Sequence, residues 1–382
     1  MVPMKIMILS AATGGGHLRA ANAIETYINE NTGYSAKTFD TFKCISSVLD
    51  KTVCDGYLFL AKKTPSFFGK LYTSTNKDTP FANMLPKLSG LFALQLLPTI
   101  TQYDPDIIIS THPFSTEMIS YLKELGKVDV PLITVMTDYG VHRAWISENV
   151  DAYVVASDDM VYELTTFGVD EKKIYPFGIP VSNVFFMEQD REMLLREMHM
   201  DENVPTVLFM AGSFGVANII QLYRSLVELH IPMQLIVITG RNKKLYDAFE
   251  EEIAHSPIKT KLIYFTIEVE KYMHISDLIV TKPGGLTVSE ALACNLPLAV
   301  FDAIPGQEED NANFLKTHDM GVRIGRDVDF AQFISDLLAE KDKLKTMKES
   351  CKRFDKSDSS ANIISLVNKL TKEYGEKRRL VH

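Results

Sequence analysis

Two consecutive glycines, Gly284 and Gly285, form the centre of a stretch whose residue types suit the binding of a nucleotide diphosphate. An apolar run at 278–280 precedes them and predicts the end of a buried strand, and the residues after them predict a helix. At such a junction backbone N–H groups approach a phosphate closely, and the helix N-terminus carries a partial positive charge. Glu290 lies further along this helix, where its carboxylate can accept hydrogen bonds from a ribose diol. The alternative is an ordinary tight turn, because the stretch is neither a Walker loop nor a G-x-G-x-x-G pattern.

Two further glycine turns follow predicted strands. The run Gly14–Gly16 comes after a strand expected at 5–10, and consecutive glycines cost so much backbone entropy that they indicate close approach of a ligand. His17 follows directly, at the start of a helix that we expect to face a cleft. The third turn contains Gly212 and Ser213 and opens the second half of the chain in the same way. Both halves therefore begin with a strand, a glycine turn and a helix.

Composition excludes several classes of protein. The chain has 382 residues, of which 46% are hydrophobic and 23% charged, which suits a globular protein of two domains. Its net charge of −9 argues against a nucleic-acid binder. The four cysteines have no C-x-x-C spacing, which argues for a reducing compartment and against a zinc site or a disulfide framework. The first residues predict a strand and no signal peptide, and the longest apolar stretch, 88–100, is too short to span a bilayer, so we expect a cytoplasmic protein that is at most peripheral to a membrane.

The segment from Lys43 to Ile100 differs from the rest of the chain in charge. It has seven lysines and three aspartates in an otherwise acidic protein, and it is rich in aromatic residues. Such a surface suits docking on an anionic bilayer, and the alternative is a helical insertion whose aromatic residues face the core. The lysines that we expect to contact the membrane include Lys62, Lys63 and Lys70.

Strand and helix signals alternate throughout the chain. Most expected strands are near-continuous apolar runs, which is typical of parallel strands covered on both faces, so the fold class is α/β with two doubly wound, Rossmann-like parallel sheets. Pro176–Pro180 is the best candidate for a domain boundary, which predicts one domain over 1–180 and a second over 181–382. An amphipathic helix is expected over 359–370. The expected strands are 5–10, 36–39, 107–110, 132–136 and 153–156 in the first half, and 206–210, 234–238, 262–265, 278–281, 298–301 and 322–324 in the second.

Several motifs together resemble the monogalactosyl- and glucosyl-diacylglycerol synthases of glycosyltransferase family 28, over nearly the whole chain. The most specific are the cluster from Thr137 to Trp145 and the run from Pro305 to Asn311, and a lone glycine turn would carry much less weight. The other motifs are Gly14–His17, Asp106–Pro113, Gly178–Val181, Thr239–Asn242 and Lys282–Gly285.

The resemblance implies a GT-B fold, in which two Rossmann-like domains face each other across a cleft. The first domain takes the lipid acceptor and docks on the membrane, the second binds the UDP-sugar, and the helix at 359–370 crosses back to the first domain. The implied reaction is an inverting hexosyl transfer, without a metal or other cofactor, from a UDP-sugar to the free hydroxyl of 1,2-diacylglycerol. Glucose is favoured by family habit, galactose is possible, and repeated addition is known in relatives. The alternatives are an N-acetylglucosaminyltransferase that acts on a lipid-linked peptidoglycan precursor and a non-catalytic regulator that senses a UDP-sugar.

The implied catalytic groups are a base for the acceptor hydroxyl and donors for the leaving diphosphate. His17 is the first candidate for the base, and phosphate binding or helix capping are its alternatives. Asp138 is either the base itself or a residue that orients a histidine. His142 and Trp145 are expected at the acceptor entrance, together with Gly15 and Gly16. The pair Asp104 and Asp106 looks like a metal-binding D-x-D and is better explained as a turn before a strand.

The implied donor site lies at the carboxyl edge of the second sheet. Gln307, Glu308 and Asn311 are expected to bind hydroxyl groups of the donor sugar, and the alternative is a polar loop in which Asn311 caps a helix. Arg241 is expected either to contact phosphate or to be an ordinary surface residue. The full set of expected donor residues is Gly212, Ser213, Arg241, Lys282, Gly284, Gly285, Thr287, Glu290, Gln307, Glu308 and Asn311.

Overall fold

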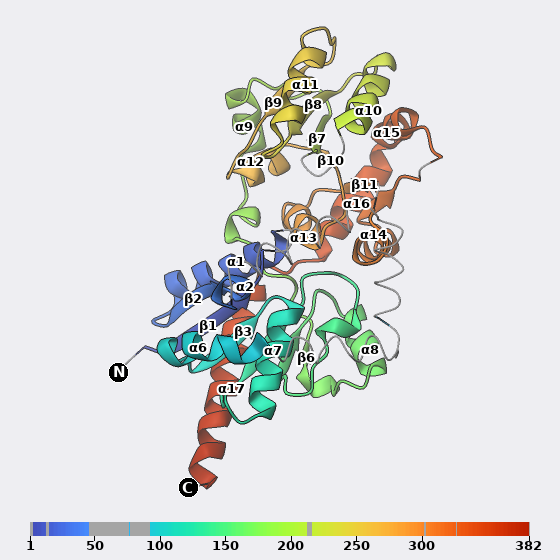
Figure 1. Cartoon of the computed structure of the whole chain (residues 1–382). Helices are drawn as coiled ribbons and strands as arrows, with labels where there is room; N and C mark the ends of the chain where they lie inside the picture. Colours follow the sequence, from blue (N-terminus) through green and yellow to red (C-terminus); the bar gives the residue numbers. More distant parts are fainter. Residues whose placement is uncertain are drawn as a thin grey trace.

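The computed structural model describes residues 3–12, 15–45, 76, 92–211, 216–301, 303–325 and 327–381. Two six-stranded parallel sheets lie one beyond the other along the length of the molecule, each flanked by helices on both faces (Figure 1). The first sheet has the order β2-β1-β3-β4-β5-β6, and the second has the order β12-β11-β10-β7-β8-β9. This is the arrangement of two doubly wound α/β domains that the sequence predicts.

The strands of both sheets are short and mostly buried. In the first sheet they are β1 (Lys5–Ser10), β2 (Ser35–Asp40), β3 (Ile107–Ser110), β4 (Leu132–Val135), β5 (Ala152–Val154) and β6 (Ile174–Tyr175). In the second sheet they are β7 (Thr206–Met210), β8 (Gln234–Ile238), β9 (Thr260–Ile263), β10 (Leu278–Thr281), β11 (Leu298–Val300) and β12 (Gly321–Arg323).

Eleven of these strands were expected from the sequence, with bounds that agree within one or two residues. Five of them, β1, β3, β7, β8 and β10, have the expected bounds. The twelfth, β6, is missing from the expectation because two residues are too few to show a hydrophobic pattern. The strand expected at 262–265 is placed two residues earlier, so Tyr264 and Phe265 lie beyond its carboxyl end.

Fourteen α-helices and four short 3₁₀ turns lie within the described residues. The helices of the first half are α1 (Gly16–Asn31), α2 (Thr41–Ile45), α6 (Leu97–Tyr103), α7 (Pro113–Glu124) and α8 (Asp159–Thr166). Those of the second half are α9 (Arg191–Glu197), α10 (Val216–Glu228), α11 (Lys243–Ile253), α12 (Val269–His274), α13 (Gly285–Ala293), α14 (Gln307–Thr317), α15 (Phe330–Ala339), α16 (Lys341–Arg353) and α17 (Ser359–Val381). The 3₁₀ turns are η1 (Leu94–Leu96), η2 (Arg143–Trp145), η3 (Glu171–Lys173) and η4 (Asn183–Phe185).

Alternate residues of each central strand enter different cores, as parallel strands covered on both faces must. In β1, Ile6 and Ile8 pack with α1 and α17, whereas Met7 and Leu9 pack with α6, α7 and α8. The core that contains Met7 and Leu9 is not confined to one domain, since Leu286 of α13 also belongs to it. The two domains therefore share apolar contacts where they meet.

The last helix, α17, lies against the first sheet although it follows the second domain in sequence (Figure 1). Ile363, Val367 and Leu370 are buried in the core of the first sheet. Near the end of the helix, the Tyr374 hydroxyl donates to Asp151 at 2.7 Å, and Arg378 pairs with Asp129 at 3.0 Å. The end of α17 is thus tied to the first domain through Tyr374 and Arg378. No helix within the described ranges is both long and apolar enough to cross a bilayer.

Candidate active site

The carboxyl edges of the two sheets meet, and the expected site residues gather there. Thr137 and Asp138 follow β4 of the first sheet, and Gly284 and Gly285 follow β10 of the second. A Cβ atom at Gly285 would overlap the carbonyl oxygen of Thr137 and would lie 3.0 Å from Oδ1 of Asp138. The domains approach so closely here that only glycine fits, which is a local reason for the second residue of the Gly-Gly pair.

His17 is held in one tautomer by the first domain. It is the second residue of α1, after Gly15 at φ 80°. Its Nδ1 lies 2.9 Å from the carbonyl oxygen of Thr111 and 2.8 Å from Oγ1 of Thr137. A carbonyl oxygen only accepts hydrogen bonds, so Nδ1 carries the proton and Nε2 carries the lone pair. Within the described part of the chain, Nε2 makes no hydrogen bond, and His17 makes no cap to its own helix.

The surroundings of His17 keep its ring neutral. Burial lowers the pKa of His17 below 6.5, and this outweighs the opposing effects of Asp138 and of the Thr111 carbonyl. The ring of His112 lies edge-on to it, with 4.6 Å between ring centroids. Burial and the neighbouring His17 hold the pKa of His112 well below 6.5. His17 is therefore unprotonated at neutral pH, as a base must be.

Asp138 lies beside this pair and is bound by the other domain. Burial raises the pKa of Asp138, while His17, a hydrogen bond from Asn311 and His142 act in the opposite direction. Nδ2 of Asn311 donates to Oδ1 of Asp138 at 3.1 Å and to the carbonyl oxygen of Pro283 at 2.8 Å, and the Tyr139 N–H donates to its Oδ1 at 2.7 Å. The Asn311 side chain is fully buried, a placement that differs from the direct sugar contact expected of it. The alternative interpretation as a helix cap is wrong, because α14 begins at Gln307 and Asn311 lies inside it.

The acceptor-side residues line the first domain near His17. Nδ1 of His142 accepts from the Ala144 N–H at 3.1 Å and caps η2. Trp145 ends this turn, is buried, and has its ring centroid 6.0 Å from that of His17. Gly16 packs against the second domain, since a Cβ there would lie 3.6 Å from Leu286.

Three aromatic side chains received no role from the sequence: His112, which lies next to His17, and two rings that contact His112. His112 stacks on Phe114 with 5.5 Å between centroids, and Phe42 lies 6.0 Å from His112. The Phe114 side chain is 41% exposed, so this group of rings reaches from His17 to the surface. The signal was the His112-Pro113 pair directly after a buried strand, which places a histidine at the carboxyl edge of the sheet.

Glu290 lies in α13 and is bound by the first domain. Nη1 of Arg19 contacts both of its carboxylate oxygens, at 2.7 and 2.9 Å. The Glu290 side chain is only 5% exposed, while that of Arg19 is 48% exposed. Burial raises the pKa of Glu290, and the charge of Arg19 and its hydrogen bonds oppose this rise. The expected ribose ligand is thus a paired, desolvated carboxylate at the domain interface.

The remaining donor residues lie around the start of α13 and the adjacent strand ends. Gly284 is the N-cap of α13 without a side-chain cap, Lys282 precedes it, and Thr287 lies in the first turn. An uncapped first turn leaves backbone N–H groups available for an anion. The Glu308 carboxylate accepts from the Ile304 N–H at 2.7 Å, next to Gln307 at the start of α14.

Arg241 does not extend freely into solvent. Its guanidinium lies over the ring of Phe265, 4.8 Å from the centroid, at the carboxyl edge where β8 and β9 end. The sequence did not single out Phe265, because the strand was expected to run through it. Phe265 is 49% exposed, so an aromatic face lies open beside the expected donor site.

Some of the predicted site residues lie outside the described residues or away from the meeting of the two sheet edges. Gly212, Ser213, Lys62, Lys63 and Lys70 lie outside the described residues. Asp104 is the C-cap of α6 at φ 53°, and Asp106 accepts from the Lys5 N–H at 2.7 Å. The D-x-D is therefore a turn before β3, at the amino edge of the first sheet. Among the described residues no group of three His, Cys, Asp or Glu side chains could hold a metal ion.

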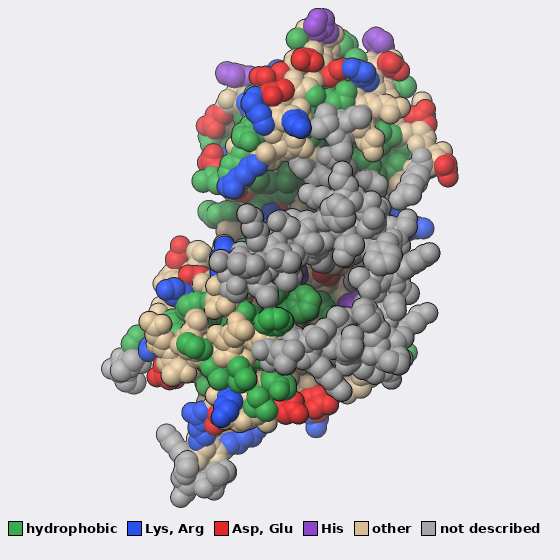
Figure 2. Space-filling view, in the orientation of Figure 1, with side chains coloured by type: hydrophobic (Ala, Val, Ile, Leu, Met, Phe, Trp, Pro, Cys, Tyr) green, Lys and Arg blue, Asp and Glu red, His purple; other side chains and the backbone are tan. Residues whose placement is uncertain are grey.

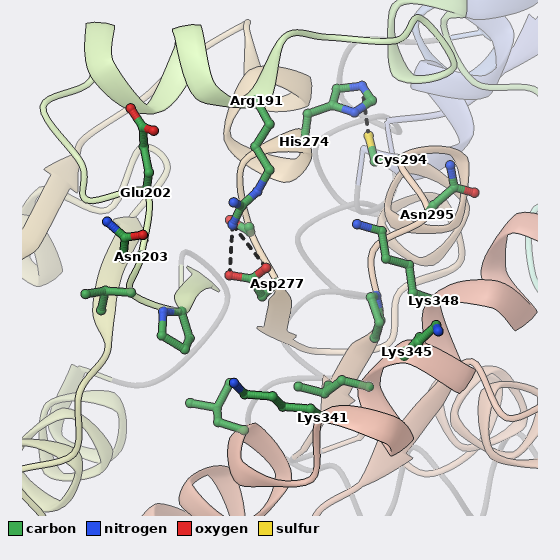
Figure 3. A pocket seen from close by; sticks show the side chains of 16 residues that line it. Arg191, Glu202, Asn203, His274, Asp277, Cys294, Asn295, Lys341, Lys345 and Lys348 are labelled. Atoms are coloured by element: carbon green, nitrogen blue, oxygen red, sulfur yellow. Dashed lines mark hydrogen bonds and ion pairs between the residues drawn. The ribbon is translucent and has the colours of Figure 1, made fainter.

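A separate pocket of about 370 Å³ lies at the amino edge of the second sheet (Figure 3). Arg191 pairs with Asp277 across it at 3.0 Å, and Lys341, Lys345 and Lys348 of α16 lie along one side. Residues just before β7, β10 and β11 line it, so it lies at the opposite edge of the sheet from Gly284 and Gly285. This pocket is therefore not the expected donor site. In the space-filling view, acidic and basic side chains are intermingled on the described surface of both domains (Figure 2).

Comparison with known proteins agrees with this geometry. A family model described as monogalactosyldiacylglycerol (MGDG) synthase matches residues 17–181, and one for the glycosyltransferase family 28 C-terminal domain matches 206–363. The processive diacylglycerol beta-glucosyltransferase of Staphylococcus carnosus is 31% identical over 348 residues, which cover 90% of this chain and 87% of that protein. The protein of the same name from Bacillus subtilis is 28% identical over 365 residues, which cover 94% of each chain.

Solved structures support the same fold. MurG of Acinetobacter baumannii superposes with a TM-score of 0.65 at 15% identity and covers 96% of this chain and 100% of that one. Anabaena HepE in complex with UDP-glucose gives a TM-score of 0.56 at 15% identity, with the same coverage. The fold is GT-B, and the chain belongs to the family of the MGDG synthases and processive diacylglycerol beta-glucosyltransferases within glycosyltransferase family 28.

Proposed function

We propose that this glycosyltransferase moves a hexosyl group, preferably glucose, from a UDP-sugar to the free hydroxyl of 1,2-diacylglycerol, with inversion. The observation that carries the proposal is the state of His17. Its Nδ1 proton is committed to Thr111, so Nε2 carries a lone pair that no described residue hydrogen-bonds, close to where the two sheet edges meet. The relatives named processive diacylglycerol beta-glucosyltransferases supply the substrate class.

The arrangement of the groups supports the following reaction. The acceptor hydroxyl oxygen forms a bond to the anomeric carbon while His17 Nε2 takes the hydroxyl proton. The bond from the anomeric carbon to the diphosphate oxygen breaks, and its electron pair leaves with UDP. Asp138 stabilises the imidazolium, and the uncapped N-terminus of α13 receives the charge that develops on the diphosphate. This scheme needs no metal ion, because backbone N–H groups supply the electrostatic stabilisation.

The expected donor residues divide among the three parts of the UDP-sugar. We assign Glu290 to the ribose, Arg241 and Lys282 to the diphosphate, and Gln307 and Glu308 to the sugar hydroxyls. Arg241 is held in place by its stacking on Phe265, which preorganises its charge at the strand end. The lipid acceptor reaches His17 from the first domain, past the rings of His112 and Phe114.

We infer further that the enzyme works at the inner face of the membrane as a peripheral protein. Its acceptor is insoluble, and the basic, aromatic segment from Lys43 to Ile100 supports docking on an anionic bilayer. Repeated addition is part of the proposal, because the glycolipid product keeps a free hydroxyl and its lipid anchor.

The decisive experiment offers diacylglycerol vesicles with UDP-glucose, UDP-galactose or UDP-N-acetylglucosamine and measures UDP release together with the glycolipids formed. The expected result is β-glucosyl-diacylglycerol, followed by products with more than one sugar. Transfer to a lipid-linked peptidoglycan precursor alone would replace the acceptor in the proposal. UDP binding without transfer to any lipid would leave a UDP-sugar sensor as the better explanation.

A further inference from the structure

The side chain of Asn311 links its own helix to two segments that carry the proposed chemistry, the loop at Asp138 and the turn at Pro283. It lies on α14 of the second domain and is fully buried. Its Nδ2 donates to Asp138 at 3.1 Å and to the Pro283 carbonyl at 2.8 Å, and its Oδ1 accepts from the Tyr139 N–H at 2.7 Å. Asp138 and Tyr139 belong to the first domain, while Pro283 precedes the Gly-Gly turn of the second.

These contacts fix the orientation of the amide without ambiguity. The Tyr139 N–H can only donate, so it must face Oδ1, and the Pro283 carbonyl can only accept, so it must face Nδ2. A side-chain amide has two N–H donors, and both are used here. No donor of Asn311 remains for a sugar hydroxyl.

The hydrogen bond to Asp138 depends on how the domains meet. Asn311 reaches Asp138 across the interface at which Gly285 touches Thr137. When the domains separate, Asp138 loses this bond and Asn311 keeps only its contact with Pro283 within the second domain. The Asn311–Asp138 hydrogen bond therefore forms only when the two sheet edges are together.

We propose that Asn311 is a positioning residue that couples domain closure to the orientation of the Asp138 carboxylate beside His17, and that it does not bind the donor sugar. The inference rests on the proposed function, because Asp138 acts there by stabilising the protonated His17. Asp138 is faced by His17 on α1, by His142 and Tyr139 on its own loop, and by the N-terminus of α13 at Gly285. His17, the Asn311 hydrogen bond and His142 favour its charged form against burial.

The test compares Asn311→Ala with Gln307→Ala, a matched truncation on the same helix at a residue assigned to the sugar. For Asn311→Ala we expect kcat to fall about 10-fold or more, with the KM for UDP-glucose within about 3-fold of the wild-type value. The acid limb of the pH–rate profile should move to higher pH by about one unit, because the Asp138 carboxylate has lost a hydrogen bond that favours its charged form. The ratio of kcat/KM for UDP-glucose and UDP-galactose should stay unchanged. In Gln307→Ala that ratio should change and the acid limb should not move.

Three further measurements test the proposal, and the first replaces Asn311→Ala where that variant folds poorly. Asn311→Asp keeps the shape and the acceptor for Tyr139, and its added carboxylate should move the acid limb further upward. In an Asp138→Asn background, Asn311→Ala should cost little additional kcat, because its effect passes through Asp138. NMR titration of the Asp138 carboxyl carbon in an Asn311 variant with UDP bound should show that the pKa of Asp138 is higher than in the wild type, without any turnover.

An altered sugar preference with an unmoved acid limb would overturn the inference and return Asn311 to the sugar site. Full additivity of Asp138→Asn and Asn311→Ala would also overturn it. A wild-type enzyme that transfers no sugar would refute the proposed function instead, and the carboxyl titration would still decide the role of Asn311.

Discussion

Arg19 and Glu290 form an ion pair between the two domains, in which one guanidinium nitrogen contacts both carboxylate oxygens at 2.7 and 2.9 Å. A carboxylate offers about four lone-pair directions, so this contact leaves room for a ribose diol on the same group. Glu290 can therefore serve as a clasp between the domains, as a donor ligand, or as both. The two roles separate in a pair of variants.

Glu290→Ala should weaken UDP binding about 10- to 100-fold, because loss of a hydrogen bond to a charged group costs about 1.5–3 kcal/mol. Arg19→Met removes the clasp, keeps the carboxylate, and should weaken UDP binding much less. Calorimetric titration with UDP measures both. Equal losses in the two variants would show that Glu290 acts only through domain contact and is not the ribose ligand.

His17→Ala should lower kcat about 100-fold or more and leave UDP affinity nearly unchanged, because a base acts in the transition state and not in donor binding. Thr137→Val is the matched control, since it removes the 2.8 Å contact to Nδ1 while the Thr111 carbonyl still fixes the tautomer. We expect this variant to lose far less activity. Loss of UDP binding with retained turnover at saturating donor in His17→Ala would make His17 a phosphate ligand and Asp138 the next candidate for the base.

The sequence predicted most strands because parallel strands covered on both faces need continuous apolar residues, which a pattern of residue types shows directly. It could not predict the partners of His17, because one of them is a backbone carbonyl and a carbonyl at Thr111 leaves no trace in residue type. Arg19 and Glu290 are 271 positions apart, and only the meeting of α1 and α13 pairs them. Gln307 and Asn311 are four residues apart on one helix, so sequence spacing assigned them one common target, whereas the structure turns Asn311 toward Asp138.

The buried His112 should make the fold sensitive to acid. Its pKa in the folded protein lies well below 6.5, so the unfolded chain binds the proton more readily as pH falls below about 6.5. The contribution of this residue to the free energy of unfolding is therefore complete above pH 6.5 and falls by about 1.4 kcal/mol per pH unit below it, until the folded pKa is reached. Denaturant unfolding at pH 7.5 and 5.5 measures the effect. His112→Gln should reduce the difference between the two pH values, and an unchanged difference would assign the acid sensitivity to other groups.

The two glycines before α13 should respond differently to alanine. A methyl group at Gly285 would overlap the Thr137 carbonyl, so Gly285→Ala should push the domains apart and lower kcat sharply, with each domain still folded. A methyl group at Gly284 would meet no atom of the described residues within 4 Å, so Gly284→Ala should keep the domain contact and thermal stability. Small-angle scattering with and without UDP gives the radius of gyration of the two variants, which shows whether the domains stay together.

UDP affinity then distinguishes steric packing from ligand approach at this turn. If the diphosphate lies against the turn, Gly284→Ala should weaken UDP binding although its methyl group clashes with none of the described residues. Wild-type affinity in Gly284→Ala would place the diphosphate elsewhere.

Membrane docking is assigned to lysines of the first half of the chain, and this assignment rests on sequence alone. Replacement of Lys62, Lys63 and Lys70 by Glu should weaken binding to anionic vesicles strongly and make it less sensitive to salt, since each lysine near such a surface contributes about 1 kcal/mol. UDP affinity should not change, because the donor site belongs to the second sheet.

The pocket at the other end of the second sheet offers a control of the same charge. Lys341, Lys345 and Lys348 are exposed, and their replacement by Glu changes the net charge of the protein by the same amount. Vesicle sedimentation should therefore separate the two triple variants, with binding lost in the first and retained in the second. Equal losses would mean that total charge governs membrane binding and that the first domain has no dedicated docking surface. Indifference to the first triple variant would move docking elsewhere, and Lys377, Arg378 and Arg379 near the end of the chain would be the next residues to replace.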